Sequence, residues 1–77
     1  MSEWTLYKRI SLAFMRELRD DETLATVLES GVSVSGEDRA LSPSVFHAGR
    51  IARNPDNEKD QWYISPDVLM NMTLEEV

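Results

Sequence analysis

The single histidine of the chain is the first residue to test for chemistry. His47 lies close in sequence to Ser42 and Ser44, and a histidine near a serine suggests a general base and a nucleophile. Nucleophilic catalysis needs the base to be held against the nucleophile and oriented by a third group, and this spacing indicates no such arrangement. We therefore predict that His47 is a partly exposed structural residue and that the protein is not an enzyme.

A run of carboxylates in the second half of the chain has the spacing of a calcium-binding loop. Asp56, Glu58, Asp60 and Asp67 fall at positions 1, 3, 5 and 12 of such a loop. Loops of this kind require glycine at position 6 and glutamate at position 12, but position 6 here is Gln61. The pattern instead predicts a solvated hairpin tip, and no metal or cofactor is expected.

The composition is that of one small folded domain spanning residues 1–77, in which 42% of the residues are hydrophobic and none is cysteine. A core of this size without disulfides is marginal, which favours a homodimer or a protein stabilised by its partner. We see neither a signal peptide nor a run of apolar residues long enough to span a membrane. We therefore expect a cytoplasmic protein that does not bind membranes.

Charge is distributed unevenly along the chain, whose net charge is −6. Residues 1–19 carry four cations against two carboxylates, whereas residues 20–77 carry four cations against twelve. Because neutralisation of phosphates supplies much of the affinity for nucleic acids, an acidic body makes nucleic acid the less favoured partner. It favours a protein partner with a basic surface.

The first part of the chain predicts a helix over residues 3–19. On a helical wheel its apolar residues fill a sector of roughly 200°. Lys8, Arg9, Arg16 and Arg19 lie on the opposite side, where they are either free for a partner or paired with the later carboxylates. A second helix over residues 22–30 would fold back on the first as a helical hairpin.

The rest of the chain predicts short strands and two helices with the same start. Strands are expected at about 32–35, 50–53 and 61–64, although Arg50 to Arg53 could also continue the helix before them. Ser42-Pro43 and Ser65-Pro66 predict helices at about 43–49 and 66–72, because serine caps a helix and proline suits its first position. The predicted fold is α+β, with the helical hairpin packed on a small antiparallel sheet.

Apolar residues near the C-terminus supply candidates for a binding surface. Trp62 and Tyr63 are neighbours on one predicted strand, so they must point to opposite faces, with one in the core and the other partly exposed. Met70 and Met72 offer adaptable apolar surface. Together with the acidic tip, the predicted partner-binding residues are Asp56, Glu58, Asp60, Trp62, Tyr63, Met70 and Met72.

Three functions are consistent with these patterns. The favoured one is a non-catalytic acidic protein that binds another protein as an inhibitor, regulator or adaptor, by analogy with small phage inhibitors. The alternative is a winged-helix-like DNA-binding regulator, in which a helix and a hairpin contact DNA. Its contacting residues would be His47, Arg50, Arg53 and Lys59. The third is a small structural or assembly subunit.

Overall fold

The computed structural model describes residues 3–8, 12–72 and 75–76, and the side chains of residues 3–6 and 13–72. Within these residues the elements follow one another as β1 (Thr5–Lys8), β2 (Leu12–Glu17), α1 (Leu24–Glu29), α2 (Gly36–Arg39), α3 (Pro43–His47), β3 (Arg50–Asn54), β4 (Asn57–Ile64), α4 (Pro66–Asn71) and β5 (Glu75–Glu76). The described strands form an antiparallel sheet in the order β4-β3-β2-β1-β5, of which β5 contributes two residues. The α+β class is therefore confirmed.

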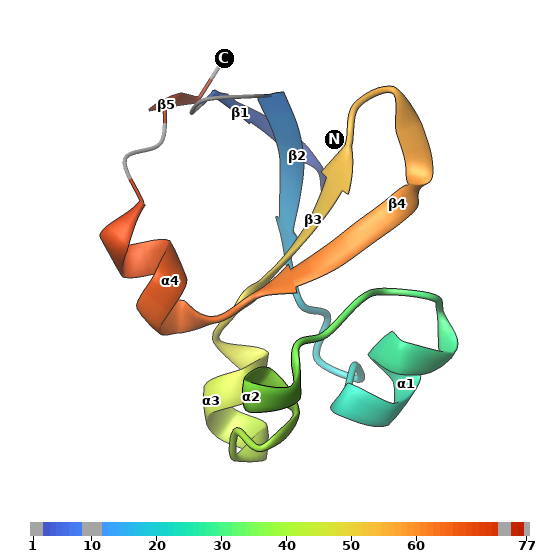
Figure 1. Cartoon of the computed structure of the whole chain (residues 1–77), viewed down its shortest axis with the longest axis vertical. Coiled ribbons are helices and arrows are strands. Elements are labelled where there is room, and N and C mark those ends of the chain that lie inside the picture. Colours follow the sequence, from blue (N-terminus) through green and yellow to red (C-terminus); the bar gives the residue numbers. More distant parts are fainter. Residues whose placement is uncertain (1–2, 9–11, 73–74, 77) are drawn as a thin grey trace.

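The helices divide between the two faces of this sheet. In Figure 1, α1, α2 and α3 gather at one end, α4 lies on its own beside the sheet, and the turn between β3 and β4 projects away from the first three helices. We call the face that contacts α1 and α3 the helix face and the opposite one the α4 face. Because side chains alternate along a strand, each central strand supplies residues to both.

The larger core lies on the helix face. Ile51 of β3 and Tyr63 of β4 are directly opposed in the sheet and pack with Val27 of α1 and Phe46 of α3. Val27 and Ile51 are fully buried. This cluster packs α1, α3 and the segment between them against the helix face of the sheet.

A smaller core lies on the α4 face. Met15, Ala52 and Trp62 occupy one cross-strand row, and Met15 and Ala52 are buried with Ile64. Leu69 of α4 packs against this cluster. The central strands are thus covered by helices on both sides.

The predicted helix starts are confirmed. Pro43 and Pro66 each begin a helix directly after a serine N-cap. The Ser65 hydroxyl accepts a hydrogen bond from the Val68 amide at 3.4 Å, whereas Ser42 forms no side-chain cap bond. The predicted helix at 22–30 is present as the shorter α1, capped by Thr23.

The predicted helix over residues 3–19 is wrong, and with it the helical hairpin. The described residues of this region form β1 and β2, with Thr5 opposite Met15 and Leu6 opposite Phe14. The wide apolar sector has a physical explanation: a strand buried on both faces has consecutive apolar residues, and these fill most of a helical wheel. Residues 9–11 lie outside the described residues.

The remaining strand predictions have mixed outcomes. Arg50 to Arg53 is a strand, β3, and the strand predicted at 61–64 is the end of β4. Residues 32–35 do not form a full strand, because Ser33 makes only one isolated bridge, to Trp62, and it is parallel. Val32 and Val34 are buried on either side of it, so the predicted alternation is correct even though the ladder is one residue long.

Candidate functional site

The acidic tip of the β3–β4 hairpin is an exposed turn. Asp56, Glu58 and Asp60 are all exposed. The turn is held by asparagine side chains, since the Asn54 Oδ1 accepts from the Asp56 amide at 2.9 Å and the Asn57 Oδ1 from the Lys59 amide at 3.1 Å. None of the ion pairs among the described residues involves the three tip carboxylates. Their charge is therefore offered to solvent or to a partner.

Trp62 and Tyr63 point to opposite faces, as predicted. Trp62 is half-buried and packs against the small core of the α4 face. Tyr63 is buried on the helix face, stacks on Phe46 with 4.3 Å between ring centroids, and donates its hydroxyl to the Phe46 carbonyl at 2.7 Å. Burial, aided by the negative charge of Asp38, raises the pKa of Tyr63 to about 12. Tyr63 is thus a core residue, and Trp62 is the one of the pair that reaches the surface.

Helix α4 presents an apolar surface to solvent. Met72 is half-buried against the small core, but Met70 is 84% exposed and Val68 is 51% exposed. A six-residue helix with Leu69 packed inward does not need two large apolar residues on its outer side. Exposed apolar groups of this kind are typical of contact surfaces.

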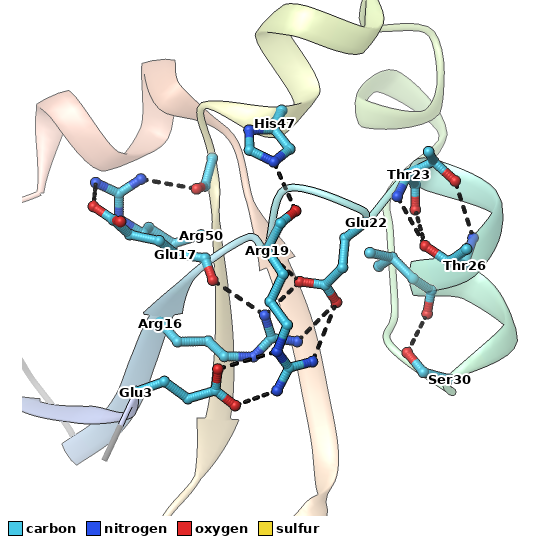
Figure 2. Close-up of polar contacts among 12 residues, drawn as sticks. Glu3, Arg16, Glu17, Arg19, Glu22, Thr23, Thr26, Ser30, His47 and Arg50 are labelled. Carbon is cyan, nitrogen blue, oxygen red and sulfur yellow. Dashed lines mark hydrogen bonds and ion pairs between the residues drawn. The ribbon is translucent and has the colours of Figure 1, made fainter. Parts of the chain in front are cut away.

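A network of ion pairs occupies the other end of the molecule. Figure 2 shows the carboxylate of Glu22 between the side chain of Arg16 and the backbone of Arg19. Arg16 donates to both Glu22 oxygens, at 2.6 and 3.0 Å, and the Arg19 amide donates to Oε1 at 2.7 Å. Both side chains of the Arg16–Glu22 pair are largely removed from solvent, at 6% and 12% exposure. The hydrogen bond from Arg16 is the main reason that the pKa of Glu22 is lowered, although burial opposes it.

Three further ion pairs among the described residues surround this network, and in one of them Nη1 of Arg19 lies 3.9 Å from Oε2 of Glu22. The side chain of Arg19 is bonded to Glu3, which is the main reason that the Arg19 pKa is raised. Arg50 lies 3.5 Å from Glu17. The basic residues predicted at the start of the chain are therefore partly neutralised internally: Arg16 and Arg19 are paired. Arg9 and the side chain of Lys8 lie outside the described part.

His47 makes a structural contact with the backbone. Its Nε2 lies 2.8 Å from the Arg19 carbonyl oxygen, which can only accept, so Nε2 carries the proton. The bond connects α3 to the loop between β2 and α1 (Figure 2). Among the described residues no group of three or more histidine and acidic side chains is placed to hold a metal ion.

The residues of the DNA-binding alternative are not brought onto one surface. Arg50 lies on the α4 face beside Glu17. Arg53, three residues further along β3, lies on the helix face, with its guanidinium carbon over the rings of Trp4 and Phe14. His47 is bonded to the Arg19 carbonyl as described. Lys59 is exposed on the hairpin and lines the same cavity as Arg53, so only these two of the four residues lie together.

Comparisons with known proteins add no identification. No family model, curated protein or solved structure matches this chain. Within the described residues, no helix combines the length and the apolar character needed to cross a membrane.

Two features of these sites were missed from the sequence. The sequence places Glu22 at the start of a predicted helix and Arg53 on a predicted hairpin, and neither position indicates the contacts found here. Phe14, Arg16 and Leu18 alternate in sequence, and a strand puts such residues on one face, but the same run also fits a broad helical stripe.

Proposed function

We propose that this protein acts by binding another protein, as an inhibitor, regulator or adaptor without chemistry of its own. The contact surface runs along β4 into α4, and we call it the β4–α4 surface. Its members are Asp56, Glu58, Asp60, Trp62, Val68, Met70 and Met72. The observation that carries the proposal is Met70, which is 84% exposed on a helix packed against the sheet by its other side.

The residues around Met70 support the view that it belongs to a contact surface and is not an isolated exposed residue. Trp62 and Met72 are both half-buried against the same small core, so each leaves part of its side chain accessible near α4. Tryptophan and methionine are enriched at protein interfaces, and tryptophan dominates the binding energy of many. An apolar centre with charged residues further along β4 has the anatomy of an interface core and rim.

The charge of the described surface supports a basic partner. Arg16, Arg19 and Arg50 are paired with the protein's own carboxylates. The carboxylates of the hairpin tip have no such pairs among the described residues. An acidic rim steers a basic partner toward the apolar centre and makes association dependent on salt.

The test compares two triple charge reversals that change the net charge equally. The tip variant is Asp56→Lys/Glu58→Lys/Asp60→Lys; the control is Asp21→Lys/Glu29→Lys/Glu37→Lys, at exposed positions near the three-helix end. Tagged proteins are used to retain partners from cells of the native source at low salt. We expect the tip variant to lose retention by about tenfold or more and the control to keep it.

Equal retention by both variants contradicts the proposal, as does equal loss. Unchanged denaturation curves for both variants ensure that the comparison reports binding. A second copy of the chain, recognised by its mass, would place the contact surface in a homodimer.

A further inference from the structure

Arg53 lines a cavity on the helix face that shares Glu58 with the proposed contact surface but none of its apolar residues. The cavity has a volume of about 720 Å³ and opens between the end of α1 and the β3–β4 hairpin. Trp4, Glu58, Lys59 and Gln61 line it together with Arg53. We call it the Arg53 cavity.

The guanidinium of Arg53 is held by aromatic rings. Its central carbon lies 4.6 Å from the ring centroid of Phe14 and 5.0 Å from that of Trp4. Phe14 is its direct neighbour across the β2–β3 ladder, so the contact follows from the strand register. Aromatic contacts of this kind orient a guanidinium through its face and leave the N–H groups, which lie in its plane, available for other bonds.

Those N–H groups have no acceptor among the described residues. Arg16 and Arg19 each hydrogen-bond a carboxylate, and Arg39 and Arg50 donate to backbone carbonyls. Arg53 has neither kind of contact within the described part of the chain, although it is half-buried. An oriented arginine with unused donors in a cavity is suited to an oxyanion.

The charge of the cavity selects among oxyanions. Arg53 and Lys59 face one carboxylate, Glu58, which leaves one net positive charge in a protein whose net charge is −6. A dianionic phosphate would be disfavoured by Glu58 and by the field of the whole protein. A monoanionic carboxylate matches the net charge and accepts two parallel bonds from a guanidinium.

We propose that the Arg53 cavity binds a carboxylate of a peptide, either a free C-terminus or an acidic side chain. The cavity is larger than a carboxylate group, so the ligand extends beyond the ion pair toward Trp4, which lines the cavity. Arg53 supplies the paired donors, and Lys59 adds long-range attraction. The site does not include Met70 or Trp62. It shares Glu58 with the β4–α4 surface, but its test uses peptide probes and Arg53, so its failure would leave the contact-surface proposal standing.

The test is a titration of the full, isotope-labelled protein, followed by NMR at the indole N–H of Trp4 and the Nε–H of Arg53. A Trp62→Phe variant assigns the indole signal. The probes are a short alanine peptide with a blocked N-terminus and a free C-terminus, the same peptide with an amidated C-terminus, and an amidated peptide carrying one glutamate. We expect saturable shifts at both positions with the first or the third peptide and none with the neutral one.

Two variants test whether binding needs the paired N–H donors of Arg53 or only its positive charge. Arg53→Lys keeps the charge but loses the paired donors, and we expect it to weaken binding by about tenfold. Arg50→Lys, outside the cavity, should bind as the parent protein does.

Three results would overturn the proposal, all with the unmodified sequence. These are equal shifts with the neutral peptide, no shift with any peptide, and tighter binding of inorganic phosphate than of either acidic peptide. The free C-terminus and the glutamate side chain are distinguished by which of their two peptides binds.

Discussion

Two regions of this small protein differ in how their functional groups are paired. At the end where α1, α2 and α3 gather, Glu22 accepts three hydrogen bonds and His47 donates to the loop beside it. Along β4 and α4, the tip carboxylates have no ion pair among the described residues and Met70 is 84% exposed. In the first region the Glu22 carboxylate is fully paired, although the Nε of Arg16 is buried without a hydrogen-bond partner among the described residues and Val45 of α3 is 43% exposed. The second region carries the unpaired tip carboxylates and the most exposed large apolar residue of the described part, Met70.

This difference separates stability from function. A buried pair such as Arg16–Glu22 adds little net stability when intact but costs much when one partner is removed. Exposed groups such as Met70 can change with little effect on folding. Substitutions near the three helices should therefore act on the free energy of unfolding, and substitutions on the β4–α4 surface on binding.

The largest expected effect is that of Glu22→Ala. It leaves the buried guanidinium of Arg16 without its carboxylate and removes the acceptor of the Arg19 amide, so we expect a loss of about 3 kcal/mol in the free energy of unfolding. Denaturant titration measures it. Arg19→Ala is the control: it removes the exposed pair with Glu3 and the long 3.9 Å contact with Glu22 but keeps the Arg16–Glu22 pair, so it should cause a small loss that salt diminishes.

Lowering the pH should reduce the free energy of unfolding of the parent protein in the same way as Glu22→Ala does. The pKa of Glu22 is lowered in the folded state by its bond to Arg16, so its stabilising contribution is present above the unfolded pKa, about 4.3, and is lost as the pH falls through the lower, folded value. Glu22→Ala should lack this contribution. If Glu22→Ala and Arg19→Ala are equally stable, the buried Arg16–Glu22 pair does not stabilise the helix end as described above.

Gly49→Ala should have the next largest effect. A Cβ at this position would lie 2.5 Å from the Ile64 carbonyl oxygen and from the Tyr63 ring, so the α3–β3 junction must shift. We expect destabilisation by about 2 kcal/mol. Gly36→Ala is the control, because a Cβ there meets nothing within 4 Å. Equal melting temperatures for the two variants would show that the close packing at Gly49 is absent.

Tyr63→Phe should cost about 1 kcal/mol, because it removes the hydrogen bond to the Phe46 carbonyl and keeps the stacked rings. Since the pKa of Tyr63 is raised to about 12, the folded state favours the neutral phenol. Its contribution is complete below the unfolded pKa, about 10, and is lost as the pH rises from there through the folded value. The alkaline loss of stability should be smaller in the variant; the same loss in both proteins would place the hydroxyl outside the core.

Local signals in the sequence predicted the second half of the fold well. Ser-Pro pairs start α3 and α4, and the turn around Pro55 separates β3 from β4. Helix caps and turns depend on a few neighbouring residues, so they can be identified from the sequence without knowledge of the tertiary structure. The first half failed because β2 is covered on both faces: Phe14 and Arg16 face one side, Met15 the other. No local rule distinguishes that pattern from a broad helical stripe.

The candidate sites show the same limit. The exposed tip at Asp56, Glu58 and Asp60 follows from composition and turn residues, and the opposite orientation of Trp62 and Tyr63 follows from strand alternation. The contacts of Arg53 depend on the β2–β3 register, which pairs it with Phe14, and on Trp4 at the start of the chain. Such long-range pairing is set by the whole sheet, so it could not be predicted once β2 was assigned to a helix.

The most direct measurement of the central claim is site-specific photocrosslinking in cells of the native source. A photoreactive residue replaces Met70 in one variant and Glu37, an exposed residue of α2, in the other. We predict one discrete crosslinked protein partner from position 70, weakened by high salt and by reversal of the tip carboxylates, and none from position 37. Equal crosslinking from the two positions, or no protein adduct from position 70, would contradict the claim that the β4–α4 surface is where this protein binds its partner.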